Sequence, residues 1–548
     1  MPRPNRLPRA GSPPLRGEGW VALSAGGPVG RGLTADTARD SAKLSRSKEL
    51  TQVTFVPNGW TLDLPLPAIF ERVRTALPDP QAVWLVGGSV RDALLRRPIH
   101  DLDFATLTAG IAIARTVANS LNAAFYPLDE TRGTGRVVVQ DEGEHFFLDF
   151  ATLRGGDLNA DLAARDFTVN AIALDLSGQV IDPMGGQADL TAKRLRQCSP
   201  TTFTDDPIRT LRVVRLAAQL DFLIDRATRD SARSAGLLLA NVSAERVRDE
   251  FLKMLGGRKP AAALRALDAL GFLTQVVPEV ATLKGVTQSL PHIYTVWEHT
   301  LAVVDYLDDV LGVLGRVHSV EAASEYALGY AAARVGRYRS ELADYLEQEL
   351  SAGRSVRSLL FFAALLHDIA KPQTRTIEAD GRVRFLGHEI KGRDLVRRRA
   401  TALRLAGPEV DRLETIVQHH MRPVLLAQGG AVSQRAIYRF FRDTGSAGVE
   451  VCLLTLADLL GTRGPELDQA EWASRVDTVV ALFDAYYRTP AVVVHPPALI
   501  TGDDIVALGV PPSKQVGELL EAVREAQAEG IVTTRDSALD LVKRLTGK

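Results

Sequence analysis

The sequence predicts an α+β protein, in which an N-terminal head with a small mixed sheet is followed by mostly α-helical segments. Short apolar runs suited to buried strands occur early, at residues 82–86 and around residues 101–104 and 148–150. Beyond about residue 193, apolar side chains recur at helical spacing instead, as at Leu211, Val214 and Ala218. The chain has 548 residues, 46% hydrophobic and 24% charged, which is ordinary globular composition and long enough for roughly three or four domains.

The first candidate site follows the first predicted strand. Two glycines there let the backbone turn tightly and approach a ligand without an intervening side chain. Residues 90–97 are predicted to be helical, so the N-terminus of that helix adds a partial positive charge to the turn, and an arginine adds a full charge. We therefore expect a nucleotide to bind at Gly87, Gly88, Ser89, Arg91 and Asp92, with its triphosphate held by the backbone amides and Arg91.

Two carboxylates follow, on the next predicted strand. Asp101 and Asp103 are two residues apart and so point to one side, while Leu102 and Phe104 face the core. Such a pair can share Mg²⁺ ions, which activate a 3′-hydroxyl and neutralise a departing pyrophosphate. A glycine turn alone, or a solvated strand end alone, would be weak evidence for this chemistry, but their conjunction predicts nucleotidyl transfer.

At this point the chain resembles the class II tRNA nucleotidyltransferase and bacterial poly(A) polymerase family, and further family motifs occur in order. The stretch 165–172 is similar to the ribose-recognition motif, which implies nucleotide contacts from Arg165, Asp166 and Asn170, although Ala164 replaces a usual arginine. Asp182, Gly186 and Arg196 match the spacing of the hinge motif. The stretch 205–215 resembles the base-reading motif and assigns nucleotide contacts to Asp206, Arg209 and Arg212.

The base-reading pair also makes chemical sense by itself. A carboxylate accepts from an exocyclic amine and a guanidinium donates to ring acceptors, so Asp206 and Arg209 can recognise the edge of cytosine or adenine without a template. A helix N-cap followed by a solvated arginine stripe is the alternative for an isolated motif. Asp149 is a candidate third catalytic carboxylate, as in related nucleotidyltransferases, although an aspartate that caps a turn would look the same.

Charge is distributed unevenly along the chain. The net charge is -1, but residues 82–192 sum to -7 and residues 193–265 to +7. The basic segment is a plausible track for the acceptor stem of tRNA, or else a set of solvated helix faces. The two cysteines, Cys198 and Cys452, are far apart in the sequence, so we expect neither a disulfide framework nor a cysteine metal site, which fits a reducing cytosol. We expect no transmembrane segment, because no uninterrupted apolar stretch is long enough to span a bilayer.

A second constellation of histidines and aspartates lies further along. It includes an adjacent His-Asp pair in the apolar run 365–370 and resembles the HD phosphohydrolase superfamily. Imidazoles and carboxylates of this kind hold a divalent transition metal that generates hydroxide near neutral pH. A lone histidine is more often a surface or core residue, so the set carries the prediction: His299, His367, Asp368, His388, His419 and Asp458.

These observations divide the chain into six parts: a disordered or loosely ordered extension (1–55), the nucleotidyltransferase head (60–192), a helical neck (193–265), the start of a body (266–290), an HD domain (291–485) and a helical tail (490–548). The resemblance implies a cytoplasmic, template-independent enzyme that adds CMP to the 3′ end of tRNA. Its partners are tRNA, CTP and, for full CCA addition, ATP, with no membrane and no obligate protein partner. Only 15 residues separate Asp149 from Arg165, which favours a CC-adding member. A poly(A) polymerase and a protein that acts mainly as an HD phosphohydrolase are the alternatives.

Overall fold

A computed structural model describes residues 64–141, 143–317 and 322–547; the predicted N-terminal extension lies outside them. The chain forms two compact units. The first contains the described residues up to Arg209 together with Leu220–Ala235, and the second contains Thr210–Gln219 and the chain from Gly236 onward. The predicted α+β class is confirmed, because the first unit is built on a mixed sheet and the second is almost entirely helical.

The sheet of the first unit has seven strands in the order β3-β4-β5-β2-β1-β6-β7. Strands β2 and β5 are parallel, and the other neighbours are antiparallel. The register sets Asp103 beside Val86 on one neighbour and beside Asp149 on the other. The strands are β1 (Val83–Val86), β2 (Asp101–Thr106), β3 (Ala124–Asp129), β4 (Thr134–Asp141), β5 (Glu144–Thr152), β6 (Ala173–Asp175) and β7 (Val180–Ile181).

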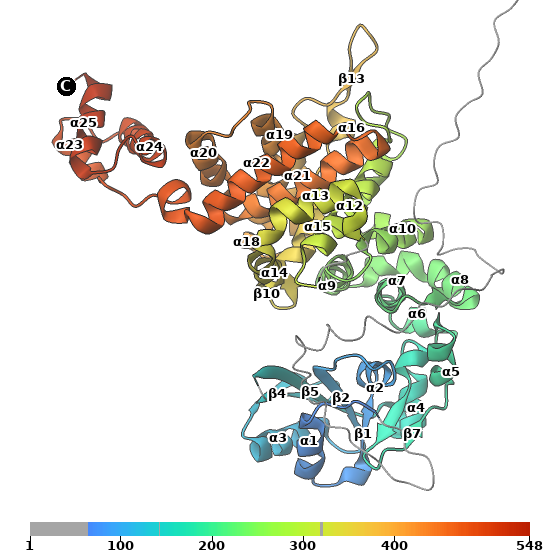
Figure 1. Cartoon of the computed structure of the whole chain (residues 1–548). Coiled ribbons are helices and arrows are strands. Elements are labelled where there is room, and N and C mark those ends of the chain that lie inside the picture. The colour runs from blue at the N-terminus through green and yellow to red at the C-terminus, as the bar shows by residue number, and fades with distance from the viewer. Residues whose placement is uncertain (1–63, 142, 318–321, 548) are drawn as a thin grey trace, which may run out of the picture. The chain divides into compact units, whose positions relative to one another are not determined.

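One face of this sheet forms the core of the first unit. Phe104 stacks on Phe150 with ring centroids 4.7 Å apart, and Phe70 stacks on Phe104 at 6.4 Å. Helices α1 (Ile69–Ala76) and α3 (Gly110–Leu121) lie together on the same side of the sheet (Figure 1). Because side chains alternate along a strand, Asp101, Asp103 and Asp149 lie on the opposite face.

Short helices complete the first unit. They are α2 (Gly88–Leu94), α4 (Leu158–Ala163), α5 (Gly186–Thr191), α6 (Thr202–Asp205) and α8 (Arg226–Ala235), with a small parallel pair β8 (Arg194–Leu195) and β9 (Leu223–Ile224). Helix α7 (Arg209–Leu220) belongs mainly to the second unit.

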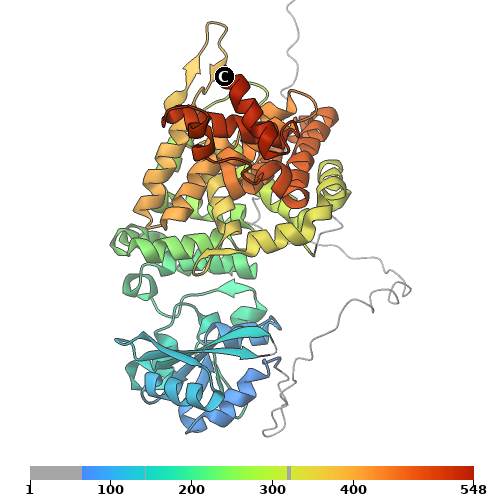
Figure 2. The same cartoon turned by 90° about the vertical axis from the view of Figure 1, so that its left-hand side faces the viewer.

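The second unit is a helical bundle in which α21 (Gly448–Arg463) is buried along almost its whole length. Helices α12 (Val296–Leu314), α15 (Val356–Leu366), α18 (Gly407–His419) and α22 (Gln469–Arg488) pack against α21. A hairpin of β12 (Thr376–Ile377) and β13 (Val383–Arg384) stands out from the bundle in both views (Figures 1 and 2). The other elements are α9 (Ala244–Leu255), α10 (Pro260–Leu270), α11 (Leu273–Val276), α13 (Tyr326–Val335), α14 (Arg339–Glu347), β10 (Glu349–Ser351), β11 (Arg354–Ser355), α16 (Lys371–Thr374), α17 (His388–Ala402), α19 (Arg422–Ala427) and α20 (Gln434–Thr444).

The C-terminal helices have an apolar core of their own. Ile505, Val523 and Val542 are buried together with neighbours from α23 (Gly502–Ala507), α24 (Lys514–Ala528) and α25 (Arg535–Thr546). Arg439 of α20 donates two hydrogen bonds to Glu525 of α24, at 2.5 and 2.8 Å. This ion pair ties the tail to the bundle.

Among the described residues, the stretch Gln434–Glu466 is long and apolar enough to cross a membrane by length and composition. In the fold, 83% of its most apolar window is buried. Such burial is what the central helix of a bundle shows, because its apolar surface faces other helices.

Candidate functional site

The glycine turn after β1 brings three predicted site residues together. Gly87 has φ +76°, a conformation that L side chains rarely adopt. A Cβ at this position would lie 3.0 Å from Arg165 Nη1 and 3.3 Å from Asp103 Oδ2. The Gly87 amide itself donates to the Ile172 carbonyl at 3.4 Å, so Gly87 contributes its conformation and lack of side chain, and the amides at the start of α2 are those of Gly88 and Ser89.

Ser89 fastens the turn to the strand that carries the two carboxylates. Its hydroxyl donates to the Asp101 carbonyl at 3.0 Å and accepts from the Asp103 amide at 2.9 Å. Asp101 is exposed and Asp103 half-buried, whereas Leu102 and Phe104 are buried on the other side of β2. Both carboxylates therefore face the open side of the sheet, beside the turn, as a shared metal site requires.

Replacing Ser89 by alanine should lower nucleotide incorporation about tenfold, because the part-buried Asp103 amide loses its acceptor at a cost of ~1–3 kcal/mol and β2 is no longer held to the turn. The check is steady-state kinetics on purified protein beside Ser120→Ala, an exposed serine on α3. Equal kcat values for the two variants would contradict a positioning role for Ser89.

Asp149 lies next to Asp103 in the parallel register of β2 and β5. Both of its carboxylate oxygens accept from Arg136 on β4, at 2.7 and 2.6 Å. The ion pair raises the pKa of Arg136, chiefly through these hydrogen bonds to Asp149. Asp149 is thus on the same face as the other two carboxylates, with Arg136 as a neighbour that sequence reasoning had not identified.

Arg91 lies behind the turn. It is buried, and its guanidinium donates to both oxygens of Asp92, at 3.0 and 2.6 Å, and to Asn170 Oδ1 at 2.6 Å. Asn170 in turn donates to Asp166 Oδ1 at 3.0 Å. Arg91 therefore supports Asn170 and Asp166, and it also lies beside the turn, since a Cβ at Gly88 would be 3.4 Å from Arg91 Nη2. Its contact with phosphate stays a prediction.

A buried carboxylate positions Arg165. Asp161 accepts from Arg165 at 3.0 and 2.9 Å and from Arg154 at 2.9 Å. Burial of Asp161 opposes its ionisation, but the two guanidinium groups outweigh burial and lower its pKa. Arg165 is consequently held with its other nitrogen near Gly87.

The base-reading motif is anchored to the same region. Arg209 donates to the Ala164 carbonyl at 3.0 Å and to the Thr202 carbonyl at 3.3 Å. Asp206 lies at the end of α6 and is half-buried, three residues before Arg209. Arg212 is exposed on α7, in the segment assigned to the second unit.

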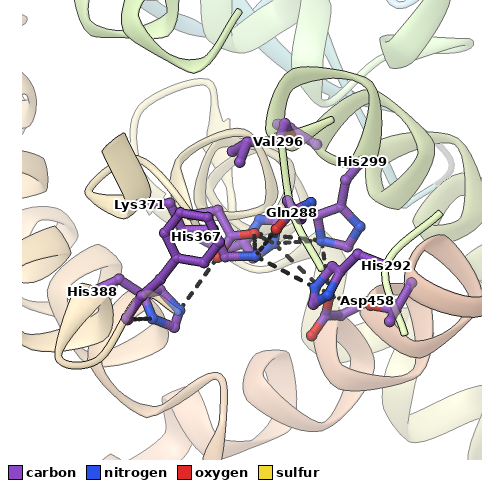
Figure 3. A network of polar contacts seen from close by, with 12 residues as sticks. Gln288, His292, Val296, His299, His367, Lys371, His388 and Asp458 are labelled. Atoms are coloured by element: carbon purple, nitrogen blue, oxygen red, sulfur yellow. Dashed lines mark hydrogen bonds and ion pairs between the residues drawn. The ribbon is translucent and has the colours of Figure 1, made fainter. Parts of the chain in front are cut away.

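The second predicted site lies in the helical bundle, where five elements bring histidines and aspartates together. His299 comes from α12, His367 and Asp368 follow α15, and Asp458 comes from α21. Figure 3 shows His299, His367 and Asp458 pointing toward one another. His299 Nε2 is 3.3 Å from His367 Nε2 and 3.1 Å from Asp458 Oδ1, so this group converges on one point.

A neighbouring group is made by Asp368, His388 at the start of α17, and His420 directly after α18. His388 Nε2 is 3.3 Å from both His420 Nε2 and Asp368 Oδ1.

Burial lowers the pKa of His420 to about 3. Burial opposes protonation of His367 as well, but Asp368 and Asp458 outweigh it and raise its pKa. Two imidazoles and a carboxylate in each group suit a divalent metal.

Beside the cluster is a cavity of about 510 Å³. Asp368, His388, His420 and Asp458 line it, and the β12–β13 hairpin contributes Arg384. Further cationic side chains on its wall are Lys371, Arg382, Arg463 and Arg475. Glu389 and Glu471 line the cavity as well, and Arg463 pairs with Glu471 at 2.9 Å, so basic and acidic side chains share the wall.

Three families match successive parts of the chain. Residues 83–196 match the poly A polymerase head domain, residues 221–284 match the probable RNA and SrmB-binding site of polymerase A, and residues 330–463 match the HD domain. The CC-adding tRNA nucleotidyltransferase of Geobacter sulfurreducens is 34% identical over 460 residues, which cover 83% of this chain and 90% of that protein. This chain belongs to the tRNA nucleotidyltransferase family.

Other members of the family are similarly related. The A-adding tRNA nucleotidyltransferase of Deinococcus radiodurans is 33% identical, with 87% of this chain and 98% of that protein covered. A solved CCA-adding enzyme in its apo form has a TM-score of 0.53 at 18% identity, covering 87% of this chain and 93% of that chain, and shares the fold. The protein is thus a nucleotidyltransferase that carries an HD domain, and its domains imply the use of divalent metal ions.

One predicted ligand in the HD domain is placed differently by the structure. His420, and not His419, joins the cluster: His420 is buried at the end of α18, whereas His419 is half-buried, with Arg422 as a neighbouring charge. His419 and His420 are adjacent in the sequence. The direction of the backbone at the end of α18 determines that His420 faces the cluster. Lys371 was also missed as a cluster residue; its Nζ lies 2.6 Å from Asp368 Oδ2.

Proposed function

We propose that this tRNA nucleotidyltransferase adds CMP to the 3′ end of tRNA without a template, as a CC-adding member of its family. The observation that carries the proposal is the placement of Asp101 and Asp103 on the open face of the sheet, fastened by Ser89 to the turn that gathers Gly87 and Arg165. The anchoring of Arg209 to Ala164 puts the base-reading motif next to the motif assigned to the ribose.

In the proposed reaction, the 3′-oxygen of tRNA forms a bond to the α-phosphorus of CTP while the bond to the β-phosphate breaks and pyrophosphate leaves. Asp101 and Asp103 would hold Mg²⁺, which promotes deprotonation of the 3′-hydroxyl and neutralises the leaving group. The amides of Gly88 and Ser89 and the guanidinium of Arg165 bind phosphate oxygens. Asp206 and Arg209 select the base by hydrogen bonds to its edge.

A short connection supports CC addition over full CCA addition. Only residues 153–157 join β5 to α4, and Arg154 within them is bound to Asp161 of α4. A switch from CTP to ATP would require Asp206 and Arg209 to change their orientation after two CMP residues have been added. By analogy with full CCA-adding members of the family, a long flexible segment between these strands and helices assists that movement. A short connection that an ion pair between Arg154 and Asp161 ties to α4 supports the absence of such a movement.

The test is an incubation of purified full-length protein and Mg²⁺ with tRNA ending at position 73, using labelled CTP or ATP alone and both together. We expect two CMP residues to be added from CTP, and no further residue when ATP is also present. Addition of a single AMP after the two CMP residues would show a full CCA-adding enzyme. Addition only to tRNA that already ends in CC would show an A-adding one, and long adenosine runs would show a poly(A) polymerase.

The histidine cluster supports a second activity, the metal-dependent hydrolysis of phosphate esters. It is favoured by the cavity directly beside the candidate metal ligands, whose wall includes Lys371, Arg382 and Arg384. A divalent transition metal bound there would supply hydroxide near neutral pH. We place both activities in the cytoplasm, where the two unpaired cysteines would remain reduced.

We expect the two activities to separate on mutation. Asp368→Asn should abolish release of nitrophenol from bis(p-nitrophenyl) phosphate in the presence of Mn²⁺ or Ni²⁺, while leaving CMP addition unchanged. The double variant Asp101→Asn/Asp103→Asn should show the reverse pattern. Hydrolysis that survives Asp368→Asn, with the protein folded, would assign that activity to another site.

A further inference from the structure

The open face of the sheet continues beyond the carboxylates as a row of side chains in register. Asp103 on β2 pairs with Asp149 on β5. Arg136 on β4 pairs with Asp149 on one side and with Tyr126 of β3 on the other. Directly paired residues point to the same side of a sheet, so Arg136 and Tyr126 share the face that carries Asp103. The row therefore runs from the candidate metal site to the β3 edge of the sheet.

The outer part of this row consists of planar side chains. Phe147 is two residues before Asp149 on β5, so it lies on the same face, and it is half-buried. The guanidinium carbon of Arg136 is 5.3 Å from the centre of the Phe147 ring. Tyr126 is 41% exposed, and its side chain also interacts with Arg136. We call these three residues, Tyr126, Arg136 and Phe147, the stacking platform.

Asp149 holds the middle of the stacking platform in place. Both of its carboxylate oxygens accept from Arg136, at 2.7 and 2.6 Å. A bidentate pair of this kind fixes the plane of the guanidinium as well as its position. Arg136 therefore offers a flat, cationic surface between two aromatic rings, which is the kind of surface on which unpaired nucleobases stack in proteins that bind single-stranded RNA.

The geometry of phosphoryl transfer determines which ligand reaches this side of the carboxylates. The attacking 3′-oxygen and the leaving pyrophosphate lie roughly in line, on opposite sides of the reacting phosphorus. The pyrophosphate is assigned to the amides of Gly88 and Ser89, in the turn that follows β1 on one side of β2. The 3′-oxygen then has to approach from the other side of β2, where β5, β4 and β3 lie. The end of the RNA consequently passes over the stacking platform.

We propose that the stacking platform binds the 3′-terminal nucleotide of the RNA, with its base stacked on Tyr126 and Arg136, and so places the 3′-hydroxyl at Asp103. Every base has a face that can stack, so such a surface accepts different terminal nucleotides. This tolerance suits an enzyme that extends first the nucleotide already present and then the cytidine that it has added. The inference rests on the proposed nucleotide addition and supplies the residues that position its RNA substrate.

The first test maps the contact directly. Full-length protein and Mg²⁺ are mixed with tRNA whose last nucleotide, at position 73, is 5-iodouridine, which cross-links on irradiation to aromatic side chains stacked on it. Mass spectrometry of the attached peptide should place the cross-link at Tyr126 or Phe147. Tyr126→Leu should lower the yield about tenfold, because one stacking partner is lost. A cross-link outside residues 124–149, or no cross-link, would overturn the proposal.

Leu107→Ala is the matched control for loss of an exposed apolar side chain. Leu107 is exposed in the same unit but directly follows the end of β2 that is remote from Asp101. Its cross-linking yield should equal that of the parent protein. A yield lowered as much as in Tyr126→Leu would overturn the proposal, and the position of the cross-link in the parent decides the question even if Tyr126→Leu fails to fold.

The second test couples the side chain to the base. An abasic nucleotide at position 73 should lower kcat/KM of the parent protein for tRNA about tenfold, the value of one stacked base, but should cost Tyr126→Leu little more than its own loss. Tyr126→Phe, which keeps the ring, should behave as the parent, and KM for CTP should stay the same in all variants. Equal losses from the abasic nucleotide in the parent and in Tyr126→Leu would overturn the proposal.

The two tests also separate this inference from the proposed function. Cross-linking needs RNA but no nucleoside triphosphate. A parent protein that cross-links at Tyr126 and adds no CMP would contradict the proposed function and support the stacking platform. A parent protein that adds CMP but cross-links elsewhere would do the reverse.

Discussion

Asp103→Asn is expected to lower kcat for CMP addition by ~10³-fold, because the variant removes one charge from the pair that would hold Mg²⁺ at the reacting phosphate. Asp101→Asn should act in the same direction. The expected loss lies in the chemical step, so single-turnover incorporation of labelled CMP into tRNA is the measurement. Binding of tRNA, which depends mainly on basic residues, should change little.

Glu130→Gln is the matched control for charge, because Glu130 is an exposed acid in the same unit, in the turn between β3 and β4. It should retain the parent rate. Metal loading of the histidine cluster should be the same in all three variants, which separates loss of the site from loss of the fold. An Asp103→Asn variant that kept its rate to within about threefold would exclude these carboxylates from catalysis.

Gly87→Ala should lower CMP addition by ~10²-fold or more. Two effects combine: a positive φ costs an L residue ~1–2 kcal/mol, and the new methyl would press on Arg165 at 3.0 Å and Asp103 at 3.3 Å. Displacement of either group misaligns reacting atoms, and a misplacement of about 1 Å can reduce a rate by ~10²-fold. Rates are to be compared with the melting temperatures of the same preparations.

Gly143→Ala separates the two effects. Gly143 also has a positive φ, +83°, but a Cβ there would meet nothing within 4 Å. Gly143→Ala should therefore lose only the stability that its positive φ costs and keep its activity, whereas Gly87→Ala should lose at least as much stability and also its activity. Equal activities would mean that the turn does not position Asp103 and Arg165.

The sequence was sufficient for features that depend on local pattern. Alternation of acidic and apolar residues in β2 and β5 predicted which side chains face the core, and the structure places Phe104 and Phe150 there in a stacked pair. The glycine turn was predicted because a strand, two glycines and a helix were adjacent in the chain. Family motifs extended the prediction to segments such as 165–170, which local pattern alone would not have identified.

Features that depend on contacts between distant segments were not predictable. The hydrogen bond from Arg91 to Asn170, which is 79 residues away, follows from the fold and not from any local pattern. Arg136 opposes Asp149 only because β4 and β5 pair in one register. His420 joins the cluster and His419 does not, because of the direction of the backbone at the end of α18. The spacing of residues in the sequence does not determine that direction.

We propose that Asp101 and Asp103 hold the metal that activates nucleotide addition. It is tested most directly by anomalous diffraction from crystals of the full-length protein soaked with Mn²⁺ and a nonhydrolysable CTP analogue. We expect manganese bound to both carboxylates, with the triphosphate against Gly88 and Ser89. Manganese in the histidine cluster, together with bound nucleotide but no ion at Asp101 and Asp103, would contradict the claim.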